Sequence, residues 1–174
     1  MKKLLGTLLV VGVLSAVGSG ALGQDKGAPA PAKAKAAPHA SAHIVLNPAD
    51  MKWGDAPPIF APGAKMAVLQ GDPSKPGLYT VRLKAGDGYK IAPHWHPTAE
   101  NITVISGTFN IGAGDKFDTA STTALVAGGF ASMPAKMHHY AWFKGDTEVQ
   151  VHGMGPFKLT YVDPKDDPTK AAKP

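Results

Sequence analysis

The sequence predicts a single all-β domain in which short antiparallel strands form a sandwich or a barrel. The first observation is composition: 20 glycines and 16 prolines among 174 residues favour a turn-rich chain over a helical one. The second is that residues 44–162 contain no convincing helical periodicity and no internal repeat. The third is that β-branched and aromatic runs in this region alternate with turn sequences at short intervals.

Six runs are predicted to be strands, and each is followed by residues typical of turns. The first four pairs of strand and turn are MAVLQ with GDPSKPG, LYTVRLK with AGDG, NITVIS with GT, and TTALVA with GG. The last two are HYAWF with KGD and EVQVH with GMGP. In residue numbers the predicted strands are 66–70, 78–84, 101–106, 122–127, 139–143 and 148–152.

Two further segments are not expected to form central strands. Residues 44–60 contain Pro48, Pro57 and Pro58, which lack backbone donors, so this segment is expected to cover a sheet edge. The stretch NIGAGDKFD at 110–118 is rich in glycine, but no helix follows it to bind an anion at its N-terminus. It is therefore predicted to be a hairpin loop.

The two ends of the chain differ in composition from the predicted domain, which spans residues 43–165. Residues 1–23 have a basic start, an apolar run and small residues before Gln24, as in a secretory signal peptide. A retained membrane anchor is the alternative, but the run is short for a span of about 20 residues. Residues 24–42 are rich in Ala, Pro and Lys, a composition that predicts a disordered linker. Residues 166–174 are predicted to form a polar tail. We therefore expect an exported protein, periplasmic or secreted, with no stable membrane insertion after cleavage.

The distribution of charge argues against a nucleic-acid partner. The net charge is +5, but from His43 onward 13 basic residues face 12 acidic ones. The predicted domain is thus nearly neutral and lacks the basic stripe of a nucleic-acid-binding surface. The absence of cysteine excludes disulfides and thiolate chemistry.

The sequence APHWHPTAE at 92–100 carries the strongest signal for a functional site. In an extended chain His94 and His96 point to the same face, where two neutral imidazoles can bind one divalent metal. The alternation of Glu100 with Ile102 and Val104 places the carboxylate on the inward face, where an unpaired charge is costly and a cation removes that cost. Two surface histidines with an exposed acid are the alternative interpretation.

The spacing of these residues resembles the first motif of the cupin superfamily. That motif is a glycine, five residues, His-x-His, three or four residues, Glu, six residues and a glycine. Here Gly88, His94, His96, Glu100 and Gly107 stand at each of these positions.

The second cupin motif is matched in part. It has a glycine, five residues, Pro-x-Gly, two residues, His, three residues and Asn. Gly128, Pro134 and His139 stand in register, whereas Lys136 replaces the glycine and Phe143 the asparagine. The resemblance covers roughly residues 43–165. It implies a jelly-roll β-barrel with one metal held by His94, His96, Glu100 and His139.

Neighbouring histidines are interpreted differently. On a strand His138 points away from His139, and the motif spacing selects His139 as the ligand. The opposite face, with His138, Tyr140 and Trp142, is then a candidate surface for a homodimer. His152 could lie beside the site, but a packing or surface role is favoured.

The predicted ligands leave the function open. The same set suits Mn, Fe, Ni, Cu or Zn. One hypothesis is a metal-dependent oxygenase, lyase or isomerase for a small molecule, in which Glu100 is catalytic as a proton acceptor if it detaches from the metal. Another is a non-catalytic metal- and ligand-binding or sensing cupin, and a metal-bearing structural domain is a third.

Overall fold

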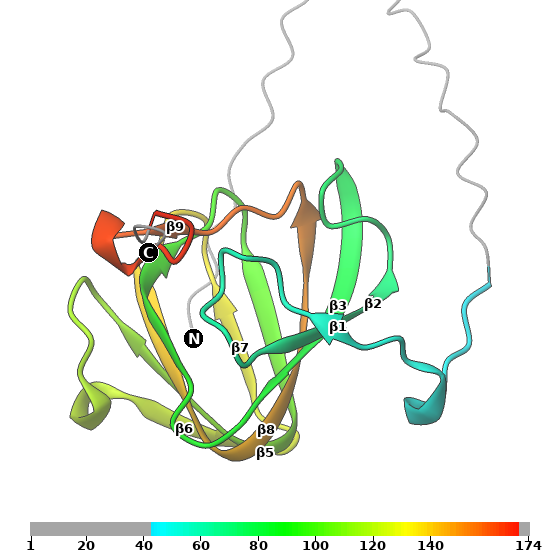
Figure 1. The fold of residues 1–174 in the computed structure, drawn as a ribbon, viewed down its shortest axis with the longest axis horizontal. Helices are drawn as coiled ribbons and strands as arrows, with labels where there is room; N and C mark the ends of the chain where they lie inside the picture. The colour runs from blue at the N-terminus through cyan, green and yellow to red at the C-terminus, as the bar shows by residue number, and fades with distance from the viewer. Residues whose placement is uncertain (1–42, 171–174) are drawn as a thin grey trace, which may run out of the picture. The chain divides into compact units, whose positions relative to one another are not determined.

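The computed structural model describes residues 43–170, and within them nine strands form one curled antiparallel sheet (Figure 1). The predicted signal peptide and linker lie outside the described residues, as do residues 171–174 of the predicted tail. Three short 3₁₀ turns, η1 (Pro48–Asp50), η2 (Thr119–Ser121) and η3 (Pro164–Asp166), complete the described elements. The strands are β1 (Gly54–Asp55), β2 (Lys65–Gln70), β3 (Gly77–Ala85), β4 (Lys90–Trp95), β5 (Glu100–Ala113), β6 (Thr123–Val126), β7 (Phe130–Met133), β8 (His139–Gly155) and β9 (Thr160–Tyr161).

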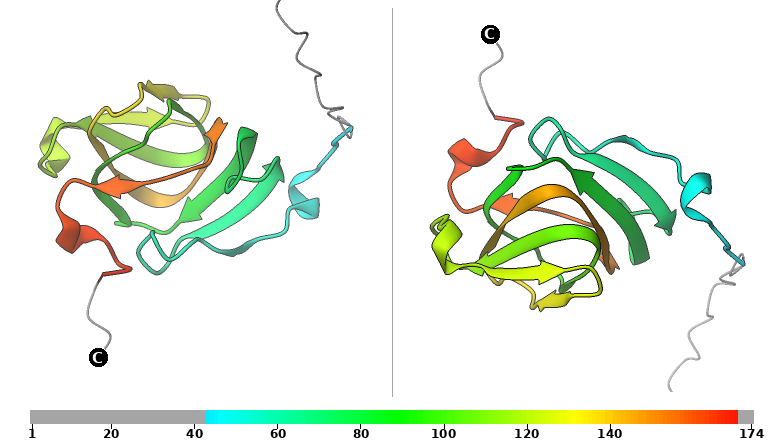
Figure 2. Two further views of the ribbon diagram at one scale, coloured as in Figure 1. Left: turned by 90° about the horizontal axis from the view of Figure 1, so that it is seen from above. Right: turned by 90° about the horizontal axis from the view of Figure 1, so that it is seen from below.

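The two long strands β5 and β8 organise the sheet. They pair with each other along most of their length, from Glu100↔Gly153 to Ala113↔His139. The second half of β8 also pairs with β3, and its first half with β4. On the far side of β5 lie β7 and β6. Figure 2 shows the result, with β2 and β3 on one side of a curled sheet and β6 and β7 on the other.

The predicted all-β fold is confirmed, and three details of the prediction are wrong. The sequence GT at 107–108 does not end a strand, because β5 continues to Ala113 through a register shift around Gly107. The KGD at 144–146 is likewise a bend within β8. Since β5 includes residues 110–113, only the second half of the predicted hairpin loop lies outside a strand. A β-bulge bends a strand without ending it, and so resembles a turn in sequence.

The barrel interior is filled by alternate residues of the strands. In β3, Tyr79, Val81, Leu83 and Ala85 are buried, and the residues between them are more exposed. Residues 44–60 contribute only the edge strand β1, which pairs with β2, so the predicted edge position is confirmed. We find no helix in residues 43–170 with the length and apolar character needed to span a bilayer.

The outer face of β8 is more enclosed than the sequence suggests. Tyr140 points away from the interior as predicted, but it is only 1% exposed. Its hydroxyl donates to the carbonyl of Asp118 (3.1 Å), and its ring contacts Phe117 in the segment after β5. Trp142 donates to Thr122 in the same segment. This aromatic face is therefore covered by the chain itself, and a homodimer stays a prediction that needs another surface.

Candidate metal centre

The fold brings the four predicted site residues together at one end of the barrel interior. His94 lies in β4, His96 directly follows that strand, and Glu100 and His139 begin β5 and β8. His94 is the pairing partner of His139 between β4 and β8. The ring centroid of His94 lies 5.0 Å from that of His96 and 4.2 Å from that of His139. All four residues are buried, with 2–7% of their surface exposed.

Each imidazole is oriented by a hydrogen bond from its Nδ1 atom to a main-chain carbonyl. A carbonyl oxygen only accepts, so Nδ1 carries the proton and Nε2 carries a free lone pair. Metal-ligating histidines are commonly oriented in this way. The three bonds are His94 to Ala92 (2.7 Å), His96 to Lys158 (2.8 Å) and His139 to Met137 (3.0 Å).

The Nε2 atoms converge on a common point. The candidate ligand atoms of the three histidines all lie within 4.8 Å of one another. Nε2 of His96 and Nε2 of His139 are buried and have no hydrogen-bond partner among the described residues. Buried polar atoms normally have partners, and imidazole nitrogen is a common ligand of divalent transition metals. The three histidines could therefore hold a metal ion.

Glu100 adds a negative charge beside these lone pairs. Its Oε2 atom lies 3.3 Å from Nε2 of His139 and 3.5 Å from Nε2 of His96. Burial acts to raise the pKa of Glu100, whereas a hydrogen bond with His139 and the charges of His96, His139 and His94 in their protonated forms act to lower it, and the net pKa is lowered. With these imidazoles neutral, a bound cation would supply that charge. An ionised carboxylate facing unprotonated nitrogens is unfavourable without a cation between them. The donor set thus fits a bound metal.

Burial also disfavours protonation of the histidines. Burial, followed by the neighbouring His139 and His96, lowers the pKa of His94 from 6.5 to about 3. Burial is likewise the main cause of a lowered pKa at His96. Both imidazoles are therefore held neutral, which is the form that binds metal.

We expect the metal-free protein to lose stability as pH falls below 6.5. The unfolded chain takes up protons at its ordinary histidine pKa, whereas the folded chain does not until nearer pH 3 at His94. The free energy of unfolding should fall by up to about 1.4 kcal/mol per pH unit for each such imidazole. Urea melts of chelator-treated protein between pH 8 and pH 5 would measure it. His138→Ala, which changes a half-exposed residue, should keep the same slope, and a flat profile would contradict the expectation.

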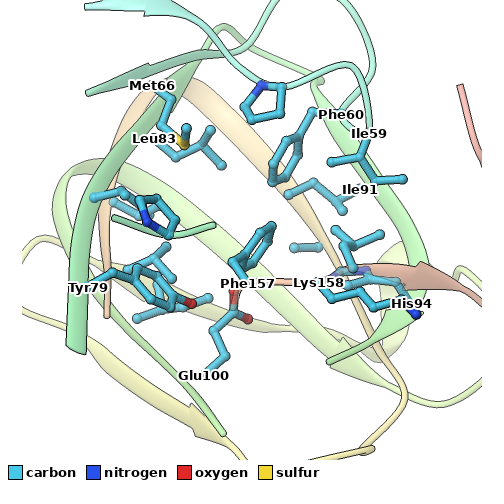
Figure 3. A pocket seen from close by; sticks show the side chains of 18 of the residues that line it. Ile59, Phe60, Met66, Tyr79, Leu83, Ile91, His94, Glu100, Phe157 and Lys158 are labelled. Atoms are coloured by element: carbon cyan, nitrogen blue, oxygen red, sulfur yellow. The ribbon is translucent and has the colours of Figure 1, made fainter. Parts of the chain in front are cut away.

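His94, His139 and Glu100 line a pocket of about 440 Å³ in the barrel interior (Figure 3). The carbonyl of Lys158 accepts from His96 beside these residues, and the exposed Lys158, Asp72 and Ser74 also line the pocket. The rest of the wall is mostly aliphatic and aromatic. It is formed by Pro57, Ile59, Phe60, Met66, Pro73, Val81, Leu83, Ile91, Ile102, Phe109, Ala141, Val149, Val151, Phe157 and Leu159, together with Tyr79.

Sequence reasoning missed Tyr79 as a pocket residue. It lies in β3 and is 3% exposed, and its ring lines the pocket near Glu100. Burial, followed by the charge of Glu100, raises the pKa of Tyr79 above its ordinary value. Its alternation with Val81 indicated burial, but only the pairings of β3 with β8 and of β8 with β5 place it near Glu100.

The two other histidines singled out in the sequence do not reach the site. His138 has a half-exposed side chain, and its Nδ1 lies 2.6 Å from Oδ1 of Asp115. His152 alternates with the buried residues Val151 and Gly153 on β8, so it points away from the pocket. Both positions agree with the roles favoured from the sequence.

The two departures from the second motif have structural explanations. Lys136 replaces the motif glycine and has a left-handed backbone conformation, with φ of 64°, which favours glycine. Its amide donates to the carbonyl of His96 (2.7 Å), which ties this turn to the metal-site loop. Phe143 replaces the asparagine and is fully buried against Tyr89 and Phe109.

Comparisons with known proteins agree with this geometry. Residues 41–158 match the family model of the ChrR cupin-like domain. No curated protein sequence matches the chain.

Solved structures resemble the chain at low sequence identity. The polyketide cyclase RemF from Streptomyces resistomycificus has a TM-score of 0.61 and 15% identity, over 72% of this chain and 89% of that one. A putative acetylacetone dioxygenase from Methylibium petroleiphilum gives 0.57 and 20%, over 72% and 85%. An RmlC-like cupin from Shewanella frigidimarina gives 0.52 and 18%, over 66% and 91%.

Proposed function

Because the chain belongs to the cupin superfamily, within the ChrR cupin-like family, we propose that it is a metal-dependent enzyme for a small molecule. His94, His96 and His139 would hold one divalent transition metal, with Glu100 as the fourth ligand. The observation that carries this proposal is that three histidines with ligand atoms within 4.8 Å of one another adjoin a pocket of about 440 Å³, which His94 and His139 line. A purely structural metal would not need an adjoining space of that size.

Different residues of the chain would have different roles at such a site. A bound divalent metal supplies Lewis-acid polarisation of a substrate oxygen and, where it is redox-active, electron transfer. The carbonyls of Ala92, Met137 and Lys158 keep the imidazoles oriented. The apolar wall excludes water and holds the body of the substrate. Glu100 would accept a proton from the substrate when it detaches from the metal.

The chemistry is proposed as oxygenase or lyase/isomerase activity. The structural neighbours include a protein described as a polyketide cyclase and another described as a putative acetylacetone dioxygenase. Both descriptions concern oxygen-bearing molecules with apolar parts, in keeping with the pocket. A non-catalytic metal- and ligand-binding cupin is the alternative, and it would use the same four residues.

Metal analysis followed by turnover assays tests this function. Purified protein should contain close to one transition metal per chain, and the element found decides among Mn, Fe, Ni, Cu and Zn. Acetylacetone and catechol would then be incubated with the protein while oxygen uptake is recorded. Turnover with oxygen uptake supports an oxygenase, and turnover without it a lyase or isomerase. Stoichiometric metal without turnover of any tested substrate favours the binding module, and metal-free protein contradicts both.

We further propose that the domain acts outside the cytoplasm, with residues 1–23 removed as a signal peptide. The support is the sequence pattern of residues 1–23 alone. The intact mass of protein from the extracytoplasmic fraction should correspond to a chain that begins at Gln24. A mass that includes Met1 would instead favour an anchored form.

A further inference from the structure

Tyr79 and Glu100 lie in one row across three strands. Tyr79 is the pairing partner of Gly153 between β3 and β8, and Gly153 is the partner of Glu100 between β8 and β5. Directly paired residues of antiparallel strands present their side chains on the same face. All three residues are buried, so the row faces the barrel interior.

The glycine in the middle of this row leaves room for the tyrosine ring. A Cβ atom at Gly153 would lie 3.2 Å from the hydroxyl of Tyr79 and 2.9 Å from the carbonyl oxygen of Ala99. The Tyr79 hydroxyl therefore lies over Gly153, on the side of Glu100, and Figure 3 shows the hydroxyl directed towards that carboxylate. A larger residue at position 153 would displace it.

Tyr79 differs from the other three tyrosines of the chain in its hydrogen bonding. Tyr89 donates to Ala61 (2.8 Å), Tyr161 to Ile59 (2.8 Å) and Tyr140 to Asp118 (3.1 Å), in each case to a main-chain carbonyl. No acceptor for the Tyr79 hydroxyl is found among residues 43–170, although its side chain is buried. The fully buried polar atoms without a partner in this part of the chain are Nε2 of His96 and Nε2 of His139, so the Tyr79 hydroxyl is accessible from the pocket. Because this hydroxyl faces the pocket, its partner is to be sought in what the pocket binds.

The surroundings of Tyr79 limit the chemistry of that ligand. Beyond the histidines, Glu100 and Tyr79, the buried residues of the pocket wall are aliphatic and aromatic, and the polar Asp72, Ser74 and Lys158 are exposed. A charged group on the body of a ligand would lose its hydration against this wall without gaining a partner. Among the buried side chains that line the pocket, the polar ones are His94, His139, Glu100 and Tyr79, so polar atoms of a buried ligand find partners there.

We propose that Tyr79 donates a hydrogen bond to an oxygen atom of the substrate, and that the substrate is a molecule with an uncharged apolar body and oxygen atoms at one end. Phenols and enolisable diketones belong to this class. The inference rests on the proposed function, since the oxygen-bearing end is placed where the metal would bind. It adds a substrate contact outside the metal ligands and a limit on the charge of the ligand body.

Two aromatic chelators with the same oxygen donors test both parts of this inference. Nitrocatechol has an uncharged body apart from its donors, whereas catechol disulfonate carries two extra negative charges on the ring. Cobalt(II)-loaded wild type, Tyr79→Phe and Tyr89→Phe would be titrated with each, with the visible absorption of chelator and cobalt as the readout. Tyr89→Phe is the matched control, since it also removes one hydroxyl but outside the pocket.

We expect wild-type protein to bind nitrocatechol at least about tenfold more tightly than the disulfonate, because the charged body must be desolvated. Tyr79→Phe should weaken nitrocatechol binding about tenfold, as for the loss of one hydrogen bond, at unchanged cobalt content and melting temperature. Tyr89→Phe should bind as wild type does.

Other outcomes would overturn the inference in distinguishable ways. Equal affinity of wild type for the two chelators would refute the proposed substrate class. Unchanged nitrocatechol affinity in Tyr79→Phe would refute the hydrogen bond. Loss of cobalt in this variant would show that Tyr79 positions Glu100 rather than contacting the ligand. Wild-type protein that takes up no cobalt would overturn the proposed function itself, and this inference with it.

Discussion

Replacing His139 with alanine is expected to abolish stoichiometric metal binding. The substitution removes one of three convergent Nε2 atoms and leaves Glu100 facing the remaining imidazoles. Loss of a group that merely orients a metal ligand costs about 10–100-fold in affinity, so loss of the ligand itself should cost at least about 100-fold. Dialysis against limiting metal, followed by elemental analysis, would measure the effect.

His138→Ala is the matched control for this experiment. His138 is adjacent in sequence and is also a histidine, but its half-exposed side chain pairs with Asp115 on the other face of the strand. We expect its metal content to match wild type. If His138→Ala lost metal and His139→Ala kept it, the register of β8 would be shifted by one residue, which reverses the faces of every side chain on that strand.

The proximity of the first three candidate ligands could be predicted from the sequence because it depends on local geometry. His94 and His96 share a face in any extended chain, and Glu100 alternates with buried Ile102 and Val104. Placing His139 required the spacing of a known motif, since its contact with His94 joins residues 45 positions apart in the chain. For Tyr79, neither the local geometry of the chain nor the spacing of a motif indicated a place at the site. Its position beside Glu100 depends on two strand pairings through Gly153. The register between strands that are distant in the sequence cannot be predicted from the sequence of either strand alone.

The errors in the strand boundaries have a related cause. Gly107 and Gly145 both have positive φ, a conformation common in turns, and each stands in a sequence that would suit a hairpin. Within β5 and β8 they instead permit a bend while the ladder continues on both sides. The short strands β7 and β9 were missed because four and two residues carry too little periodicity to recognise.

The two glycines that bound the first motif, Gly88 and Gly107, have the same backbone conformation and different surroundings. Both have φ of 74°, which favours glycine over residues with a side chain. A Cβ at Gly88 would meet no atom within 4 Å. A Cβ at Gly107 would lie 2.5 Å from the carbonyl oxygen of Asp146 and 2.7 Å from Cα of Thr147, and closer still to the Thr147 hydroxyl.

Gly107→Ala is therefore expected to destabilise the domain much more than Gly88→Ala. The left-handed conformation alone should cost about 1 kcal/mol in either variant, after allowance for the lower entropy of the unfolded alanine chain. At Gly107 the overlap with the backbone of β8 adds the cost of forced repacking, for a total of about 3 kcal/mol or more. Chemical denaturation of both variants, with the same metal loading, would measure the two changes.

The size of the difference between the variants tests how the two long strands are held together. Thr147 is buried, and its hydroxyl contacts the carbonyls of Thr108 and Lys144, on both sides of the bend that Gly107 faces. Displacing Thr147 should thus loosen β5 from β8 where both strands bend, which a simple conformational penalty would not do. A loss at Gly107 of at least about 2 kcal/mol beyond that at Gly88 would confirm close packing at the bend. Equal losses would mean that the backbone conformation alone selects glycine at both ends of the motif.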